Sequence, residues 1–191
     1  MGTFRESRTA KNLLVSYAFE SQAVTRYSFF ANQARQDGYI QIASIFRETA
    51  DQECEHALRF FKFFNGGELE VTASFLTGVV KTTLDNLLAA ADLEKYVHRE
   101  LYPGFAEIGR EEGFNRAAEV WDAISVAEVH HEKTFRALAE NVATGKSFSR
   151  ESNRVWRCMN CGYIHEGQRA PEKCPACVRP SNYFEIFVPN W

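Results

Sequence analysis

The chain has 191 residues, of which 45% are hydrophobic and 25% are charged. This length holds one ordinary domain and one small domain, and the composition excludes disordered and collagen-like chains. The net charge is -3, and the 22 Lys and Arg residues are scattered among 25 Asp and Glu residues, so no basic stripe is available to bind nucleic acid.

The chain contains no apolar run of about 18 residues, and its first residues are polar and charged. We therefore expect neither a signal peptide nor a membrane span. The sequence predicts a cytoplasmic protein that does not act with a membrane.

Two long helices are predicted first. Apolar residues recur at helical spacing from about Ser7 to Asp37 and from Tyr39 to Asn65, and glycines stand where both helices would stop. The segment 68–78 has no clear period, which suits a long crossover connection.

Two further helices follow the crossover. The third is predicted from about Thr82 to Gly113, and Pro103 should kink or interrupt it because proline lacks the N–H that a helix interior needs. The fourth runs from Phe114 to Thr144. Four long helices with one long connection predict an all-α, ferritin-like four-helix bundle.

The composition changes near residue 146 to short segments rich in Gly, Pro, Cys and aromatic residues. We therefore divide the chain into a bundle at 1–146 and a small metal-bound domain of strands and loops at 147–191.

An internal repeat relates the two halves of the bundle. Several residues recur 75 positions later, which indicates a duplicated helix pair with a pseudo-twofold axis. The related pairs are Tyr27 and Tyr102, Phe30 and Phe105, Ala31 and Ala106, Arg35 and Arg110, and Gly38 and Gly113. Glu20 and Glu94 differ by 74 positions instead, so one extra residue lies between Glu94 and Tyr102. A single inserted residue is most easily absorbed as a π-bulge, which we predict there.

Glutamates and histidines in the bundle have the spacing of a metal site. Two Glu-x-x-His pairs stand 75 residues apart, and each places a carboxylate and an imidazole on one helix face. A single glutamate stands on each of the other two helices, which completes the set known from ferritin-like two-metal carboxylate proteins. The six candidate catalytic and metal-binding residues are Glu20, Glu53, His56, Glu94, Glu128 and His131.

Charge explains why such a set needs metal. Four glutamates facing a bundle core would carry four negative charges in a low dielectric, at a cost far above the few kcal/mol of ordinary stability. Two divalent cations cancel that charge, and carboxylates with imidazoles suit iron or manganese. The expected assignment is Glu20 and His56 on one metal, Glu94 and His131 on the other, and Glu53 and Glu128 as bridges.

Two tyrosines are candidates for support of this site. Tyr27 and Tyr102 are related by the repeat, and their hydroxyls are able to donate hydrogen bonds to ligand carboxylates. Packing in an amphipathic core is an equally good interpretation of both.

Four of the five cysteines form two C-x-x-C pairs near the C-terminus. In an unexported protein this pattern favours a metal over disulfides, and it closes a tetrahedral four-thiolate site of either zinc or iron type. A unit of about 40 residues needs such a metal to be stable. The expected ligands are Cys158, Cys161, Cys174 and Cys177.

A zinc ribbon is the structural alternative for this module. Against it, Gly162-Tyr163 after the second cysteine, Pro175 within the second pair and a set of aromatic residues are similar to rubredoxin. These features favour iron.

The bundle ligands followed by the cysteine module resemble the rubrerythrin family along nearly the whole chain. The resemblance implies a non-haem diiron peroxidase with two irons in the bundle and one iron held by four cysteines. Electrons from a reductase would pass through the cysteine iron to the diiron site, which reduces hydrogen peroxide to water in defence against oxidative stress. The resemblance also implies a homodimer in which the cysteine iron of one subunit lies near the diiron site of the other.

The chain departs from the family at one position. Members usually carry a further glutamate three residues after the one that corresponds to Glu94, and that glutamate exchanges with the histidine corresponding to His56 when the iron changes oxidation state. Here the position is Val97, which cannot bind metal, and His98 and Glu100 point in other helical directions. We therefore expect a fixed ligand set with His56 bound in both oxidation states.

Three other functions compete with the peroxidase. A ferritin-type protein that oxidises and handles iron would explain the bundle but gives no role to the cysteine iron. An oxidase that uses dioxygen would also explain the bundle. A structural or regulatory protein with a zinc ribbon is the third alternative.

Overall fold

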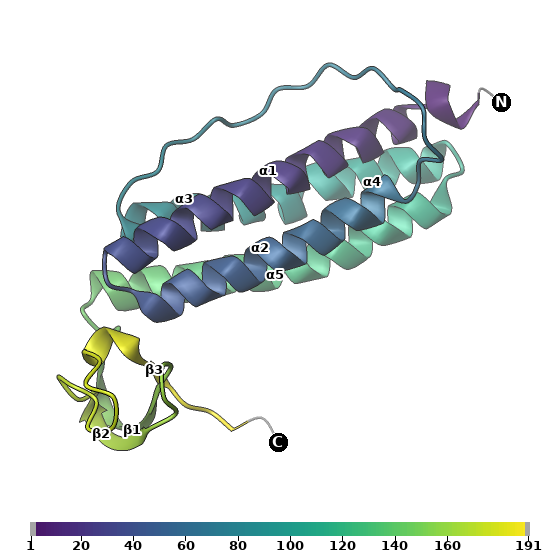
Figure 1. The fold of residues 1–191 in the computed structure, drawn as a ribbon. Helices are drawn as coiled ribbons and strands as arrows, with labels where there is room; N and C mark the ends of the chain where they lie inside the picture. The colour runs from purple at the N-terminus through teal and green to yellow at the C-terminus, as the bar shows by residue number, and fades with distance from the viewer. Residues whose placement is uncertain (1–2, 190–191) are drawn as a thin grey trace.

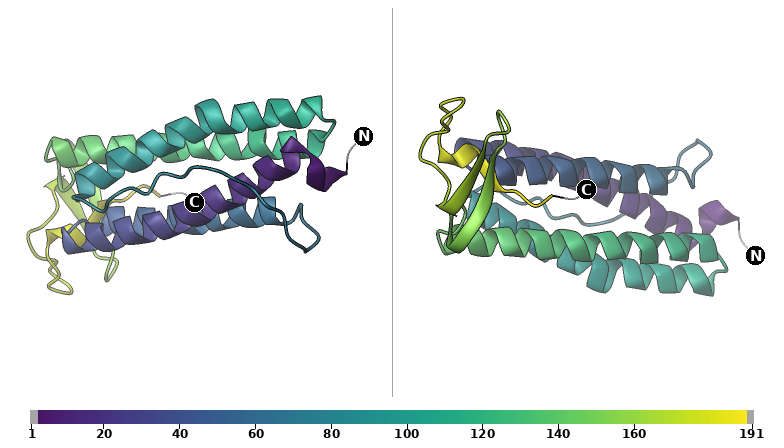
Figure 2. Two further views of the ribbon diagram at one scale, coloured as in Figure 1. Left: turned by 90° about the horizontal axis from the view of Figure 1, so that it is seen from above. Right: turned by 90° about the horizontal axis from the view of Figure 1, so that it is seen from below.

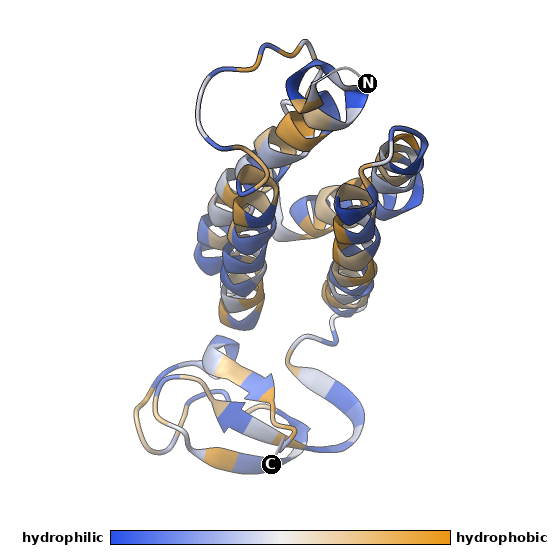
Figure 3. Ribbon diagram, turned by 90° about the vertical axis from the view of Figure 1, so that its right-hand side faces the viewer, coloured by the Kyte–Doolittle hydropathy of each residue, from blue (hydrophilic) through white to orange (hydrophobic). Residues whose placement is uncertain are grey.

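The amphipathic stretches form a helical bundle, and the cysteine-rich segment forms a small three-stranded domain at one end of it (Figures 1 and 2). The structure is a computed structural model and describes residues 3–189. Each helix carries both hydrophobic and hydrophilic residues along its length, as expected of helices that bury one side (Figure 3). The bundle helices are α1 (Arg8–Gln36), α2 (Ile40–Phe61), α3 (Thr83–Tyr96), α4 (Tyr102–Glu111) and α5 (Asn115–Ala143), and a short 3-10 turn, η1 (Phe4–Glu6), precedes them.

The third helix of the bundle contains the predicted irregularity. Between α3 and α4 lies the π-helical turn η2 (Val97–Leu101), and the Tyr102 N–H donates to the carbonyl of Val97, five residues back. This confirms the π-bulge inferred from the repeat. Pro103 itself does not interrupt the helix, because it falls in the first turn of α4, where a missing N–H is tolerated. The irregularity is the π-turn that lies directly before α4.

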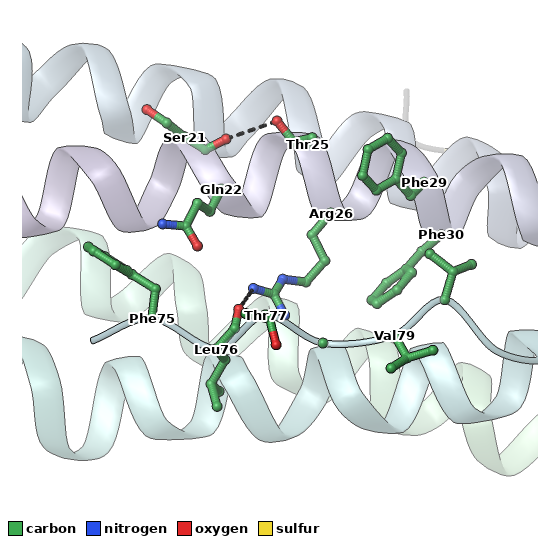
Figure 4. A pocket seen from close by; sticks show the side chains of 12 residues that line it. Ser21, Gln22, Thr25, Arg26, Phe29, Phe30, Phe75, Leu76, Thr77 and Val79 are labelled. Atoms are coloured by element: carbon green, nitrogen blue, oxygen red, sulfur yellow. Dashed lines mark hydrogen bonds between the residues drawn. The ribbon is translucent and has the colours of Figure 1, made fainter. Parts of the chain in front are cut away.

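A long crossover connects α2 to α3 and runs along α1 (Figure 1). Arg26 of α1 anchors it, because its Nη2 donates to the carbonyl of Leu76 at 2.7 Å (Figure 4). The crossover and α1 enclose a groove of about 470 Å³ lined by apolar residues such as Phe29 and Val79. None of the groove's lining residues is a candidate metal ligand.

The duplication extends to the aromatic core on both sides of the centre of the bundle. One cluster of buried side chains contains Tyr27, Phe46 and Phe135, and the other contains their repeat mates, Tyr102, Trp121 and Phe60. The ring centroids of Tyr27 and Phe135 lie 5.3 Å apart, and those of Tyr102 and Phe60 lie 5.6 Å apart. Both pairs are packed edge to face. The predicted pseudo-twofold axis is therefore visible in packing as well as in sequence.

Carboxylates at the ends of two repeat-related helices cap helices of the other half. Asp37 accepts from the backbone N–H of Thr83 at 2.9 Å and from its hydroxyl at 2.6 Å. Glu112 accepts from Thr9 in the same way, at 2.8 and 2.6 Å. Although partial burial opposes it, hydrogen bonding from Thr9 lowers the pKa of Glu112 to about 2. Each half of the bundle thus satisfies first-turn N–H groups of the other half.

The small domain is a three-stranded antiparallel sheet in the order β2-β1-β3. The strands are β1 (Ser149–Cys158), β2 (Ile164–Arg169) and β3 (Phe184–Ile186), and the 3-10 turn η3 (Ser181–Tyr183) precedes β3. Trp156 and Phe184 are fully buried and form a small core with Cys158 and Cys174. The domain contacts the bundle where Phe148 stacks on Tyr39, with ring centroids 6.0 Å apart.

The last bundle helix ends at Ala143 and β1 begins at Ser149. The boundary between residues 146 and 147 stays a prediction within this short connection. Among the described residues, no helix has both the length and the apolar character needed to cross a bilayer.

The reciprocal caps generate a stability prediction. Replacing Glu112→Gln keeps the size of the side chain but removes the charged acceptor of Thr9, and we expect the free energy of unfolding to fall by about 1 kcal/mol. Asp37→Asn, at the opposite end of the bundle, should have a similar effect, and the two losses should add in the double variant because the sites share no contacts. Urea unfolding followed by helical circular dichroism measures all three. A double variant no less stable than either single variant would contradict the independent roles of the caps.

Candidate metal centres

All six candidate ligands of the bundle meet in its core. Glu20 comes from α1, and Glu94 comes from the last turn of α3, directly before the π-turn. α2 and α5 each supply a Glu-x-x-His pair. The ligand atoms form two groups, and the atoms of each group lie within 4.8 Å of one another. The groups are Glu20, Glu53, His56 and Glu128, and Glu53, Glu94, Glu128 and His131.

This grouping matches the predicted division of ligands. Glu53 and Glu128 belong to both groups, as expected of bridging carboxylates, whereas each of the other four residues belongs to one. That these six residues bind metal stays a proposal.

Both histidines turn the same ring nitrogen toward the carboxylates. His56 Nδ1 lies 2.9 Å from Glu53 and 3.0 Å from Glu128. His131 Nδ1 lies 2.7 Å from Glu128 and 3.0 Å from Glu53. Each Nδ1 therefore faces the space that the bridging carboxylates share.

The carboxylates are almost completely excluded from water. Glu20, Glu53, Glu94 and Glu128 are between 0% and 3% exposed. Burial, followed by the charges of Glu53 and Glu128, raises the pKa of Glu20 and Glu94 well above the usual value. Burial acts in the same direction on Glu128, but the hydrogen bond from His131 and the close approach of His56, at 3.0 Å, outweigh it and lower its pKa.

The histidines take up positive charge in the metal-free chain. Burial alone would lower the pKa of His56 and of His131, but the close approach of both Nδ1 atoms to Glu128 and Glu53, within 3.0 Å, raises both values to about 10. Two protonated imidazoles and protonated carboxylates thus neutralise the cluster when no cation is bound.

Both tyrosine hydroxyls donate to ligand carboxylates across the repeat. The Tyr27 hydroxyl donates to Glu94, and the Tyr102 hydroxyl donates to Glu20. Burial and the nearby glutamate charges raise the pKa of both phenols, so both remain donors. The hydrogen bonds that the sequence suggested are present, and the same tyrosines also pack in the aromatic clusters.

The donor set fits two divalent cations. Glu53 Oε1 and Glu128 Oε1 are buried without an aligned hydrogen bond, although a histidine Nδ1 lies near each. Lone pairs left unsatisfied in a buried site are costly unless a cation accepts them. Four carboxylates balance two divalent charges, and oxygen ligands with one imidazole for each metal suit iron. The bundle thus contains a ferritin-like diiron site.

Val97 and its neighbours supply no further ligand. The Val97 side chain is 1% exposed and packs with the apolar cluster around Tyr102. His98 turns away, because its Nε2 lies 2.7 Å from Glu132 Oε2 on α5. Glu100 is exposed, and neither it nor His98 belongs to the two ligand groups.

One residue beside the cluster was missed from the sequence. Gln52 of α2 places its Oε1 2.8 Å from His131 Nε2 on α5. Its position next to Glu53 was the only available signal, and polar residues are common on exposed helix faces.

The four cysteines of the small domain converge as predicted. All are free, and their sulfurs lie within 4.8 Å of one another. Cys158 Sγ lies 3.7 Å from Cys177 Sγ, and Cys161 Sγ lies 3.6 Å from Cys174 Sγ. Such spacings fit the edges of a tetrahedron with metal–sulfur bonds of about 2.3 Å. The backbone N–H of Arg179 donates to Cys177 and lowers the pKa of this thiol to about 6, which favours the thiolate that binds metal.

The two C-x-x-C turns differ in the residue that follows them. Gly162 has φ +78°, which glycine adopts freely, but Val178 occupies the equivalent position at φ +60°. A β-branched residue in the left-handed region is strained, at a cost of about 1–2 kcal/mol. The second turn is therefore held in place by the structure around it, including the hydrogen bond from the Val178 N–H to the Cys174 carbonyl.

Both the bundle and the small domain match known protein families. The family model of rubrerythrin matches residues 11–139, and the model of the rubredoxin-like domain of rubrerythrin matches residues 156–185. The chain is 51% identical to rubrerythrin of Nitratidesulfovibrio vulgaris over 191 residues, which is 100% of both chains. It is 47% identical to rubrerythrin of Porphyromonas gingivalis over 99% of this chain and 94% of that one.

Solved structures are similar to this chain in fold. A nigerythrin in a mixed-valence state is 31% identical, with a TM-score of 0.63 over 94% of this chain and 86% of that one. A bacterioferritin of Desulfovibrio desulfuricans superposes with a TM-score of 0.68 over 76% of this chain and 87% of that one. Its identity is 19%, so it supports the ferritin-like fold alone.

The charge state of the cluster predicts how pH acts on the metal-free bundle. The raised pKa of His56 and His131 means that their protons stabilise the fold below pH 6.5, and this contribution disappears as the pH approaches 10. Protons on Glu20 and Glu94, whose pKa is also raised, act with the same sign. We expect the thermal midpoint of the metal-free bundle to fall between pH 5 and pH 9, as measured by helical circular dichroism with a chelator present.

The metal-loaded protein is the control for this experiment. Bound cations replace the protons, so its midpoint should depend much less on pH in this range. A metal-free midpoint that stays level or rises from pH 5 to pH 9 would contradict the protonated cluster.

Proposed function

Since this chain belongs to the rubrerythrin family, we propose that it is a non-haem diiron peroxidase, which reduces hydrogen peroxide to water with electrons received through the four-cysteine iron. The observation that carries this proposal is the presence of a buried diiron site and a rubredoxin-like four-cysteine site in one chain. An iron-handling protein of ferritin type would need the first site but has no use for the second.

The reaction consumes two electrons and two protons for each hydrogen peroxide and yields two waters. Two bound ferrous irons would supply the electrons that break the O–O bond. Tyr27 and Tyr102 keep their hydroxyl protons and hold Glu94 and Glu20 in fixed orientations. His56, with 15% of its side chain exposed, is more open than the buried carboxylates, so we place the access route of peroxide on its side of the cluster.

Electron delivery within one chain would span a long distance. The cysteine domain contacts the bundle at Tyr39 and also through η3 and β3, which meet α2. His56 lies 17 residues beyond Tyr39, about 25 Å away at 1.5 Å per residue. Electron transfer slows steeply with distance. We therefore propose a homodimer in which the cysteine iron of each subunit serves the diiron site of the other.

Charge supports this pairing. Residues 147–191 carry 6 Lys and Arg against 4 Glu, whereas residues 1–146 carry 16 Lys and Arg against 21 Asp and Glu. A positive domain and a negative bundle attract each other between two copies of the chain.

The electron donor to the cysteine iron would be a separate reductase. The reduced state of the cysteines suits a cytoplasmic location.

Val97 gives this member of the family its own ligand behaviour. Because Val97 is buried among apolar side chains and His98 is held by Glu132, no described side chain is placed to replace His56. We propose that His56 remains a ligand in both oxidation states. Structures of the oxidised and the reduced protein test this, and an oxidised structure with His56 detached would contradict it.

Colour distinguishes the iron protein from the zinc alternative. A ferric four-thiolate site is red and loses its colour on reduction, whereas a zinc site is colourless throughout. We expect the purified protein to be red, with one iron for each set of four cysteines by metal analysis. A colourless protein with stoichiometric zinc would favour the structural or regulatory alternative.

Peroxidase activity is tested by anaerobic reoxidation. The iron-loaded protein is reduced, one equivalent of hydrogen peroxide is added, and the visible absorption of the cysteine iron is followed. We expect the colour to return rapidly. Glu53→Ala or His131→Ala should slow its return by more than about 100-fold, since losing even an outer partner of a metal ligand costs 10–100-fold.

His130→Ala is the matched control for this experiment. His130 is exposed beside His131 on α5 and belongs to neither ligand group, so its replacement should leave the rate unchanged. Slow recovery in the unaltered protein, or recovery indifferent to His131→Ala, would favour iron handling or a reaction with dioxygen.

A further inference from the structure

The internal repeat makes the inner sides of the two histidines alike. His56 Nδ1 and His131 Nδ1 each lie 2.7–3.0 Å from the same two bridging carboxylates. If the repeat extended to every neighbour, the two metal positions would be equivalent.

The outer sides of the histidines are not alike. His131 Nε2 lies 2.8 Å from Gln52 Oε1, but the position related to Gln52 by the 75-residue offset is Ala127, which has no polar side-chain atom. Within residues 3–189, no side chain or backbone group hydrogen-bonds to His56 Nε2. His56 is also more exposed, with 15% of its side chain accessible against 5% for His131.

An amide oxygen selects one form of the neutral imidazole that binds metal. When His131 gives up one proton to take a cation, Gln52 Oε1, which only accepts, keeps the remaining hydrogen on Nε2 and frees the Nδ1 lone pair for the metal. This is the form that binds a metal at Nδ1. A partner on the outer nitrogen of a ligand histidine also fixes the ring orientation and raises its basicity.

We propose that Gln52 is a positioning residue that fixes His131 for metal binding, so that the metal position of Glu94 and His131 binds a divalent cation more tightly than the position of Glu20 and His56. This inference rests on the proposed diiron site. It predicts ordered filling: the first equivalent of metal occupies the His131 position, and the second occupies the His56 position.

Cobalt titration of the full chain tests the proposal. The four-cysteine site is kept filled with iron, the bundle site is stripped, and Co²⁺ is added anaerobically against a competing chelator. We expect two Co²⁺ for each bundle with two different dissociation constants. His131→Ala should remove the tighter one, and His56→Ala should leave it in place.

Two replacements of Gln52 separate positioning from packing. Gln52→Met keeps the length of the side chain without an acceptor, and it should weaken the tighter constant about 10–100-fold while leaving the weaker one unchanged. Gln52→Glu retains an acceptor oxygen and should restore tight binding. Because Gln52 is exposed, both variants should remain folded without metal, as helical circular dichroism would show.

The repeat provides a reciprocal variant. Ala127→Gln places an amide on α5 in the position from which it would reach His56, and it should strengthen the weaker constant toward the tighter one. Equal constants in the unaltered protein, or a Gln52→Met variant with both constants unchanged or both equally weakened, would overturn the role of Gln52. Uptake of fewer than two Co²⁺ by the unaltered bundle would instead overturn the diiron site on which the proposed function depends.

Discussion

Four carboxylates buried in one helical core are the constraint on which the rest of the structure depends. Such a cluster cannot remain fully ionised in a low dielectric, and the histidines and tyrosines that touch it supply positive charge or a proton. The histidines face the bridging carboxylates with Nδ1, and the tyrosines donate to the two outer glutamates. The twofold arrangement of the bundle follows from this constraint, because duplicating one helix pair supplies both halves of a balanced cage.

The extra residue in the second half shows how the cage tolerates an insertion. Thr9 and Thr83, like Glu20 and Glu94, are 74 residues apart, whereas the pairs after the π-turn are 75 apart. The turn at Val97–Leu101 absorbs the difference, so that Glu94 before it and Tyr102 after it both reach the core. The same turn carries Val97 into the apolar cluster and lets His98 meet Glu132 on α5. A local backbone change therefore preserves the symmetry of the ligands and alters their surroundings.

The features predictable from sequence were those fixed by spacing. Glu-x-x-His and C-x-x-C place side chains through local geometry, so the ligand groups and the cysteine cluster could be inferred without knowing the fold. The partnership of Gln52 with His131 joins two helices, and the repeat concealed it because the related residue is Ala127. The stacking of Tyr39 on Phe148 depends on how two separately folded units meet, which no spacing encodes. Val178 was missed because its strain arises from backbone conformation, and residue type gives no sign of it.

The two metal sites stand in opposite relations to the fold that holds them. The bundle buries two aromatic clusters independently of the ligands, and protons on the histidines and glutamates neutralise its cage, so the diiron site is formed before metal arrives and loading exchanges protons for cations. The small domain buries few side chains, chiefly Trp156 and Phe184, and two of its cysteines complete that core. A core of this size does not hold a chain together, so the metal must stabilise the domain. Metal loss should therefore leave the bundle folded but disorder the small domain, which makes the four-cysteine site the more vulnerable of the two.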